Sequence, residues 1–282
     1  MQRGIRPRIE TLLPAQLCLG ESTDLVVHVE CPEPVRAGAC VVDLYCALQP
    51  GPDWDATIVA IERLTVASAH GLARGITALR LPLELPAGLP PSRSGADAGR
   101  GSVRYGADVR IDLPGRADAH ASFAPTVLAA AVAPAHLSTP VVLTIRSPGG
   151  HVAGQVNVDA QVMRVGEKTR VGIVCSNAGR RVVFAAQLTG SLVRPGAVRT
   201  LATYRFEREL GDTLPGTAAE VFVVVPPDAT ASFQARLGGV SWSLDVSLAE
   251  GLSAAAVARV PVVIVEPRTP LTSVLGSGLA FR

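Results

Sequence analysis

Lysine is almost absent from this chain of 282 residues, because Lys168 is its only lysine and arginine supplies every other basic residue. Together with the abundance of Ala, Val and Gly, this indicates a bacterial genome rich in G and C. The basic residues never run to three in succession, and the formal net charge is only +2. Nucleic-acid-binding proteins usually carry a clustered basic surface, so we expect no nucleic-acid partner.

Long apolar runs are missing as well. No stretch of about 18 apolar residues occurs, so we expect no transmembrane segment. The first residues, MQRGIRPRIETLLPAQ, lack the apolar core of a secretory signal, which predicts a cytoplasmic location.

The cysteines form no CxxC pair and are odd in number: Cys18, Cys31, Cys40, Cys46 and Cys175. In a cytoplasmic protein they are expected to be free thiols that pack as small apolar side chains. A zinc site built from His28, Cys31, Cys40 and Cys46 is an alternative, since zinc accepts mixed nitrogen and sulfur ligands. Strand alternation, however, places His28 and Cys31 on opposite faces and Cys46 in the core. We therefore expect neither metal nor cofactor.

Motifs that carry catalysis are also lacking. The chain has no nucleophile elbow, phosphate loop or HExxH sequence, and its five histidines are scattered singly. No sequence context selects a Ser-His-Asp trio. The segment GSGLA near the C-terminus lacks the strand-then-helix context of a dinucleotide fingerprint. We expect a protein that is not an enzyme.

An internal repeat is what the chain does contain. Six positions separate Pro86 from Ser92 in PAGLPPS, and six separate Pro226 from Ser232 in PPDATAS. A strand that opens with an aromatic residue follows each of these turns. The two turns therefore occupy matching positions in two copies of one unit.

Two further registers support the duplication. LGESTDLVVHVEC, from Leu19, resembles VGEKTRVGIVCSN, from Val165. APTVLAA, from Ala124, resembles VPVVIVE, from Val260. Three matches in the same order predict a tandem duplication.

Strict alternation of apolar and polar residues identifies the repeated unit as a set of β-strands. YGADVRIDL opens with Tyr105 and WSLDVSL opens with Trp242, and each aromatic is in phase with the apolar face. We expect both rings, and that of Tyr45, in the core. Pro82 interrupts a run of alternating leucines, which favours an edge strand or a bulge.

The fold class that follows is all-β, because each copy has several short strands, frequent turns and no crossover helices. We expect two tandem antiparallel β-sandwich domains of the immunoglobulin-like kind. The N-terminal domain is predicted at 1–132 and the C-terminal domain at 140–267, with a tail at 268–282.

These motifs together resemble the arrestin-fold superfamily. The GE turn, the LPPS turn, the glycine-rich loop and YGADVRIDLPG are similar to the arrestin N-terminal domain. VGEKTRVGIVCSNAGRRV and VVVPPDATASF are similar to its C-terminal domain. The likeness extends from about residue 8 to residue 267 and is greatest to α-arrestins, retromer arrestin-like subunits and sporulation-control proteins. It implies a bacterial, cytosolic scaffold or adaptor that binds other proteins.

The resemblance also implies where partners bind. Arrestins carry a phosphate-sensing lysine pair on the first strand, where this chain has arginines instead. Other arginines flank the glycine-rich loop, and their guanidinium forks suit carboxylates and phosphates, although solvated loop charge is the alternative. The expected partner-binding residues are Arg3, Arg6, Arg8, Arg93, Arg100 and Arg104.

The C-terminal tail TPLTSVLGSGLAFR is apolar for a chain end. In arrestins a C-terminal segment folds back onto the N-terminal domain. The resemblance therefore implies a docked tail, with Leu279 and Phe281 as anchors and Arg282 beside a carboxylate. A frayed terminus is the alternative.

Binding is expected through the sheet faces, the strand edges or the crevice between domains, since an extended peptide can pair with an edge strand. The same edges allow a homodimer. The alternative function is a carbohydrate- or small-ligand-binding module, which needs exposed aromatic rings. Only Trp54 and Tyr204 are candidates for that role, because the other large aromatics are expected in the core.

Overall fold

The computed structural model describes residues 7–12, 16–49, 55–66, 71–94, 102–128, 138–251 and 253–265. These residues form strands and turns and no helix, which confirms the all-β class. The described part of the chain accordingly has no helix of the length and hydropathy that a membrane crossing requires.

The strands fall into two ranges of the sequence. Those in the first range are β1 (Arg8–Leu12), β2 (Gln16–Cys18), β3 (Ser22–Cys31), β4 (Cys40–Gln49), β5 (Thr57–Val66), β6 (Gly75–Glu84), β7 (Ser102–Ile111), β8 (Ala119–Phe123) and β9 (Thr126–Leu128). Those in the second range are β10 (Val141–Arg146), β11 (Ala153–Val158), β12 (Val162–Arg164), β13 (Lys168–Cys175), β14 (Gly179–Arg194), β15 (Ala197–Thr213), β16 (Ala218–Val224), β17 (Phe233–Gln234), β18 (Gly239–Glu250) and β19 (Ala256–Val265).

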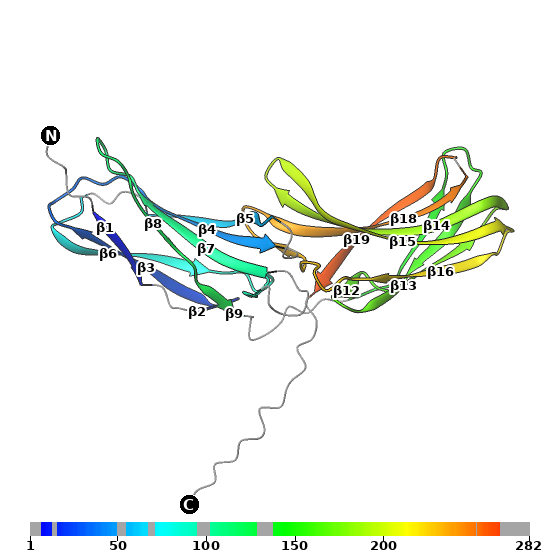
Figure 1. Ribbon diagram of the computed structural model, residues 1–282, viewed down its shortest axis with the longest axis horizontal. Coiled ribbons are helices and arrows are strands. Elements are labelled where there is room, and N and C mark those ends of the chain that lie inside the picture. The colour runs from blue at the N-terminus through cyan, green and yellow to red at the C-terminus, as the bar shows by residue number, and fades with distance from the viewer. Residues whose placement is uncertain are drawn as a thin grey trace, which may run out of the picture.

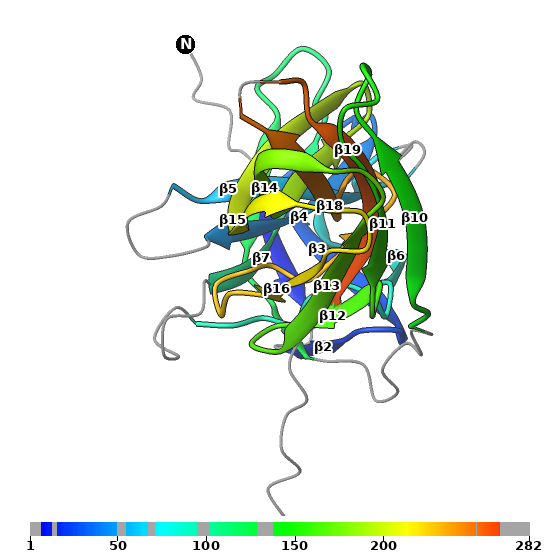
Figure 2. The same ribbon diagram turned by 90° about the vertical axis from the view of Figure 1, so that its right-hand side faces the viewer.

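Strand pairing among the described residues stays within 8–128 or within 141–265, which we call the N-terminal half and the C-terminal half. The N-terminal half has the sheets β1-β3-β6 and β5-β4-β7-β8 (Figure 1). The C-terminal half has the sheets β10-β11-β13-β16 and β12-β19-β18-β14-β15, and β17 pairs with β18. Figure 2 shows β10, β11 and β13 side by side at the end of the molecule. The arrangement is that of a β-sandwich.

Antiparallel pairing has one exception in each half. β2 runs parallel to β9, with Gln16 opposite Thr126, and β12 runs parallel to β19, with Val162 opposite Val263. Each short parallel pair joins a strand that precedes a GE turn to the closing strand of its half. The sequence did not predict these parallel pairs.

Alternation places the expected side chains in the core. Tyr105 and Trp242 are 5% and 4% exposed, so the prediction that both are buried is confirmed. Pro82 lies on β6, which pairs with β3 alone, so its assignment to an edge strand is also confirmed. The prediction for Tyr45 was wrong. Its ring is half-buried on the outer face of β4, where it covers Gly106 of β7.

The turns that contain Ser92 and Ser232 have equivalent hydrogen bonds, as the predicted repeat requires. The Ser92 backbone N–H donates to the Val127 carbonyl at 2.7 Å, and the Ser92 hydroxyl accepts from the Val127 N–H at 2.8 Å. Ser232 makes the same two bonds with Ile264, at 2.7 and 2.8 Å. Each serine thus ties its turn to the closing strand of its half.

The GE turns are equivalent as well. Gly20 donates its N–H to Leu85 at 2.7 Å, and Gly166 donates to Val225 at 2.8 Å. Both glycines have positive φ angles, +76° and +83°, which side chains with a Cβ rarely adopt. A glycine is therefore required at this turn in both halves.

One of the three predicted registers was wrong by a single residue. Val127 and Ile264 make equivalent bonds and lie 137 positions apart, as Tyr105 and Trp242 do, whereas the sequence match of Ala124 with Val260 implied 136. The segment around Ile264 is a continuous apolar run, which has no alternation to set a register.

The two halves meet at β5, an edge strand that pairs only with β4. Leu237 donates its N–H to the Ile61 carbonyl at 3.4 Å, and the Arg194 guanidinium donates to the carbonyl of Ile58. Arg236 forms an ion pair with Glu62 at 2.9 Å. Backbone carbonyls at this edge therefore accept hydrogen bonds from the C-terminal half.

Candidate binding face

The outer face of the sheet β10-β11-β13-β16 carries apolar side chains in contact with water. Alternation turns Ile173 and Val223 inward, where both are buried. It turns Val142, Val174 and Phe222 outward, and these side chains are 58%, 45% and 51% exposed. Three of the large exposed apolar side chains of the described chain therefore share one sheet face.

A shallow depression of about 600 Å³ lies on this face. Gly172 of β13 forms part of its floor, between Asn157 on β11 and Glu220 on β16. Because glycine has no side chain, the side chains on the neighbouring strands project above it. We call the outer surface formed by Val142, Gln155, Asn157, Arg170, Gly172, Val174, Glu220 and Phe222 the β13 face.

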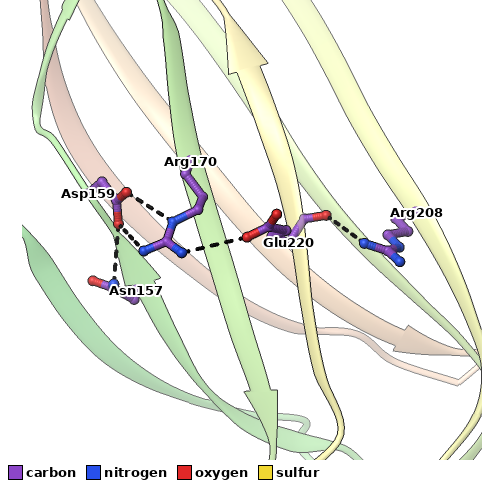
Figure 3. Close-up of polar contacts among 5 residues, drawn as sticks. All are labelled: Asn157, Asp159, Arg170, Arg208 and Glu220. Atoms are coloured by element: carbon purple, nitrogen blue, oxygen red, sulfur yellow. Dashed lines mark hydrogen bonds and ion pairs between the residues drawn. The ribbon is translucent and has the colours of Figure 1, made fainter.

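Arg170 connects the polar groups of the β13 face (Figure 3). Its Nε donates to Asp159 Oδ2 at 3.0 Å, and its Nη1 lies 3.6 Å from Glu220 Oε2. Asn157 donates its side-chain amide to Asp159 at 3.3 Å, and Arg208 of β15 reaches the Glu220 carbonyl at 3.4 Å. One guanidinium on β13 thus contacts a carboxylate on β16 and another just beyond the end of β11.

The charge state of this group is constant over the physiological range. The hydrogen bond to Asp159, and the charge of that carboxylate, raise the pKa of Arg170. Its guanidinium therefore remains protonated beside the Asp159 and Glu220 side chains. A permanently charged group of this kind suits recognition of a polar surface better than proton transfer.

The arginines predicted from the sequence are not gathered at one site. Arg8 lies on β1 and pairs with Glu10 at 2.8 Å, on the outer face of the three-stranded sheet. Arg104 is exposed on β7, in the other layer of the N-terminal half, and Arg93 forms a β-bridge with Val103 beside it. Arg93 and Arg104 are thus neighbours, whereas Arg8 belongs to the opposite face.

Several predicted residues lie outside the described residues. They are the partner-binding candidates Arg3, Arg6 and Arg100, the aromatic candidate Trp54, and the tail residues Leu279, Phe281 and Arg282.

The alternative zinc ligands are separated by the fold. Cys31, Cys40 and Cys46 are buried, while His28 is half-buried on the outer face of β3. Burial raises the pKa of all three thiols, that of Cys46 to about 12, so they stay protonated near neutral pH. Within the described ranges, no group of three His, Cys, Asp or Glu side chains could hold a metal ion.

Tyr204, the second candidate for a sugar-stacking ring, is already stacked. Its ring lies 6.2 Å from that of Trp242 with an interplanar angle of 14°, and its hydroxyl is 3.5 Å from Asp228. One face of the ring is therefore used within the protein. A sugar could therefore stack on the other face of this ring alone.

Sequence reasoning missed the β13 face. The strand that carries Arg170 and Val174 was identified only as part of a repeat, and Asn157, Glu220 and Phe222 were not singled out. One feature of the sequence could have indicated this face. Val174 and Phe222 are apolar residues at positions where strand alternation points the side chain outward. Cross-strand register was needed to bring these positions together.

The chain matches no known family model, and no curated protein matches it either. Only the residues of the chain itself therefore indicate a function.

Proposed function

We propose that the protein is a non-enzymatic scaffold or adaptor of the arrestin type, which binds protein partners in the bacterial cytoplasm. It would consist of two tandem β-sandwich domains, at 1–132 and 140–267. The repeated turns and the strand pairing that stays within each half support this organisation. The resemblance of its turn and strand motifs to those of arrestins supports the type of scaffold.

The observation that carries the proposal is the apolar content of the β13 face. Protein interfaces combine an apolar centre with a polar rim, and exposed apolar patches mark such sites. Val174 and Phe222 supply apolar contacts, and Arg170, which is already paired with Asp159 and Glu220, supplies a polar one. An arginine with such partners has less side-chain entropy to lose when another protein binds.

The composition of the depression favours binding over catalysis. Among the described residues that line it, none is Ser, Cys or His, and Glu220 is the only one with a carboxylate. A nucleophile with an adjacent base, which hydrolysis by covalent catalysis needs, is not found among those side chains. The depression is also shallow, whereas small-molecule sites usually bury most of the ligand.

The test compares two valine substitutions on opposite sheets. Val174→Glu alters the β13 face, and Val257→Glu, on β19 of the other sheet, is the matched control because Val257 is also exposed. Full-length tagged protein is used to capture partners from the native host, and each captured protein is then tested as a purified component. We expect a partner that binds the wild type and Val257→Glu but not Val174→Glu.

Thermal melts of both variants show whether the fold is retained. Equal binding by the two folded variants would contradict a role for the β13 face. Turnover of any small substrate in proportion to protein would contradict the non-enzymatic proposal.

A further inference from the structure

β15 is a long strand with one edge that no described strand pairs with. It has 17 residues and, among the described strands, pairs only with β14, which pairs with β18 on its other side. The free edge presents backbone N–H and C=O groups to which another strand can bind. Proteins often block such edges with proline, but β15 contains none between Ala197 and Thr213.

The side chains of β15 divide into two faces. Arg205 lies opposite Gln187, so it points outward together with Thr203, Glu207 and Glu209. Phe206 lies opposite the buried Ala186 and points inward, yet it is only half-buried, at an edge that no described strand pairs with. An apolar ring is thus left beside unpaired backbone.

The order of residues around Phe206 is self-complementary. In an antiparallel pair, directly opposed residues share a face, so a two-fold axis perpendicular to the sheet must lie midway between the two copies of one residue. We call this an axis through that residue. An axis through Phe206 places Arg205 opposite Glu207 of a second copy, and Glu207 opposite Arg205. The two Phe206 rings then face each other across the axis.

The two adjacent registers oppose like charges. An axis through Arg205 opposes that residue to itself. An axis through Glu207 opposes two Glu207 carboxylates, although it also places Arg205 opposite Glu209 twice. Of these three registers, only the one through Phe206 forms opposite-charge pairs without a like-charge pair. Like charges in directly opposed positions destabilise a strand pair, while opposite charges stabilise it. The register through Phe206 also converts the Arg205–Glu207 ion pair, 2.8 Å within one chain, into a cluster of four alternating charges.

We propose that the protein forms a homodimer in which β15 pairs antiparallel with β15 of a second copy, about a two-fold axis through Phe206. The sheet β12-β19-β18-β14-β15 becomes continuous across the dimer. Because the β13 face belongs to the other sheet, its outer surface stays available, and dimerisation does not depend on the scaffold function. Two copies would present two such faces, which increases the apparent affinity for a partner with repeated sites.

A charge exchange tests the register. Sedimentation velocity from micromolar to millimolar concentrations measures the dissociation constant of the full-length protein. Arg205→Glu should weaken the dimer by about tenfold or more, because it opposes carboxylates twice. The double variant R205E/E207R should restore wild-type dissociation. Arg199→Glu is the control on the same strand, since Arg199 lies beyond the β-bulge between Thr200 and Ala202, outside the regular register about Phe206.

Crosslinking tests the axis directly. Opposed Cα atoms in an antiparallel pair lie about 4.5–5.5 Å apart, within the span of a disulfide. In a Cys18→Ser background, F206C should give a covalent dimer on mild oxidation, and T203C, which would lie far from its counterpart across the axis, should not. A monomeric wild type would overturn the proposal. A dimer unaffected by R205E, or one that T203C links as well as F206C, would also overturn it.

Discussion

Tyr105 donates its hydroxyl to the carbonyl oxygen of Pro90 at 2.6 Å, and both the ring and the bond are buried. Trp242 repeats the arrangement in the other half, where its indole N–H donates to Thr230 at 2.8 Å. The carbonyl at the same position of the turn thus accepts a hydrogen bond in both halves, from a tyrosine in one and from a tryptophan in the other. The bond joins the turn between sheets to the strand that follows, so it stabilises the connection on which the sandwich depends.

Removing only the hydroxyl of Tyr105 should be costly. In Y105F the Pro90 carbonyl loses its donor in a buried site, and we expect the free energy of unfolding to fall by about 1–3 kcal/mol. Tyr45→Phe is the control, because Tyr45 is half-buried on the outer face and should change stability by less than about 0.5 kcal/mol. Urea denaturation measures both. Equal effects would show that the buried bond contributes nothing.

Truncating Trp242 should cost more. W242A removes a large buried ring together with its hydrogen bond and its stacking on Tyr204, so the expected loss is about 3–5 kcal/mol. The measurement is again the free energy of unfolding in denaturant. A loss below about 1 kcal/mol would mean that the ring is not packed as described.

Two glycines beneath aromatic rings should differ in their response to alanine. A Cβ at Gly190 would lie 2.7 Å from the buried ring of Trp242, which cannot move away. We therefore expect G190A to destabilise the protein by about 1–3 kcal/mol through overpacking. The control is G106A, where the new methyl group meets the half-exposed ring of Tyr45 and that ring can swing outward. Similar melting temperatures for the two variants would contradict this explanation.

Alkaline pH should destabilise the fold through Tyr204. Burial and the nearby charge of Asp228 raise the pKa of Tyr204 from its ordinary value near 10 to about 12. Since the folded state holds this proton more tightly, the contribution is complete below pH 10 and is lost as the pH rises from about 10 to 12. The ultraviolet absorbance of tyrosinate should show a step near pH 12 that is missing in Y204F. If the step that Y204F lacks lay near pH 10 instead, the Tyr204 hydroxyl would not be buried as described.

The strands that carry the core could be predicted because their chemistry is local. Alternation in YGADVRIDL and WSLDVSL depends only on the period of a strand. It correctly predicts that Tyr105 and Trp242 are buried. The same reasoning failed for Tyr45, because an aromatic on the outer face can cover a glycine of the neighbouring strand, Gly106. It also failed by one residue in the apolar run at Val260, which has no alternation.

The sequence by itself determined the all-β class, the repeated turns at Ser92 and Ser232, and the face on which each core side chain lies. These properties depend on turn residues and on a period of two, which neighbouring positions specify. Only the tertiary structure decided that Arg170 lies between Asp159 and Glu220, that Tyr204 stacks on Trp242, and that β15 has a free edge. Those relationships depend on which strands pair and in which register, and contacts between residues far apart in the chain set both.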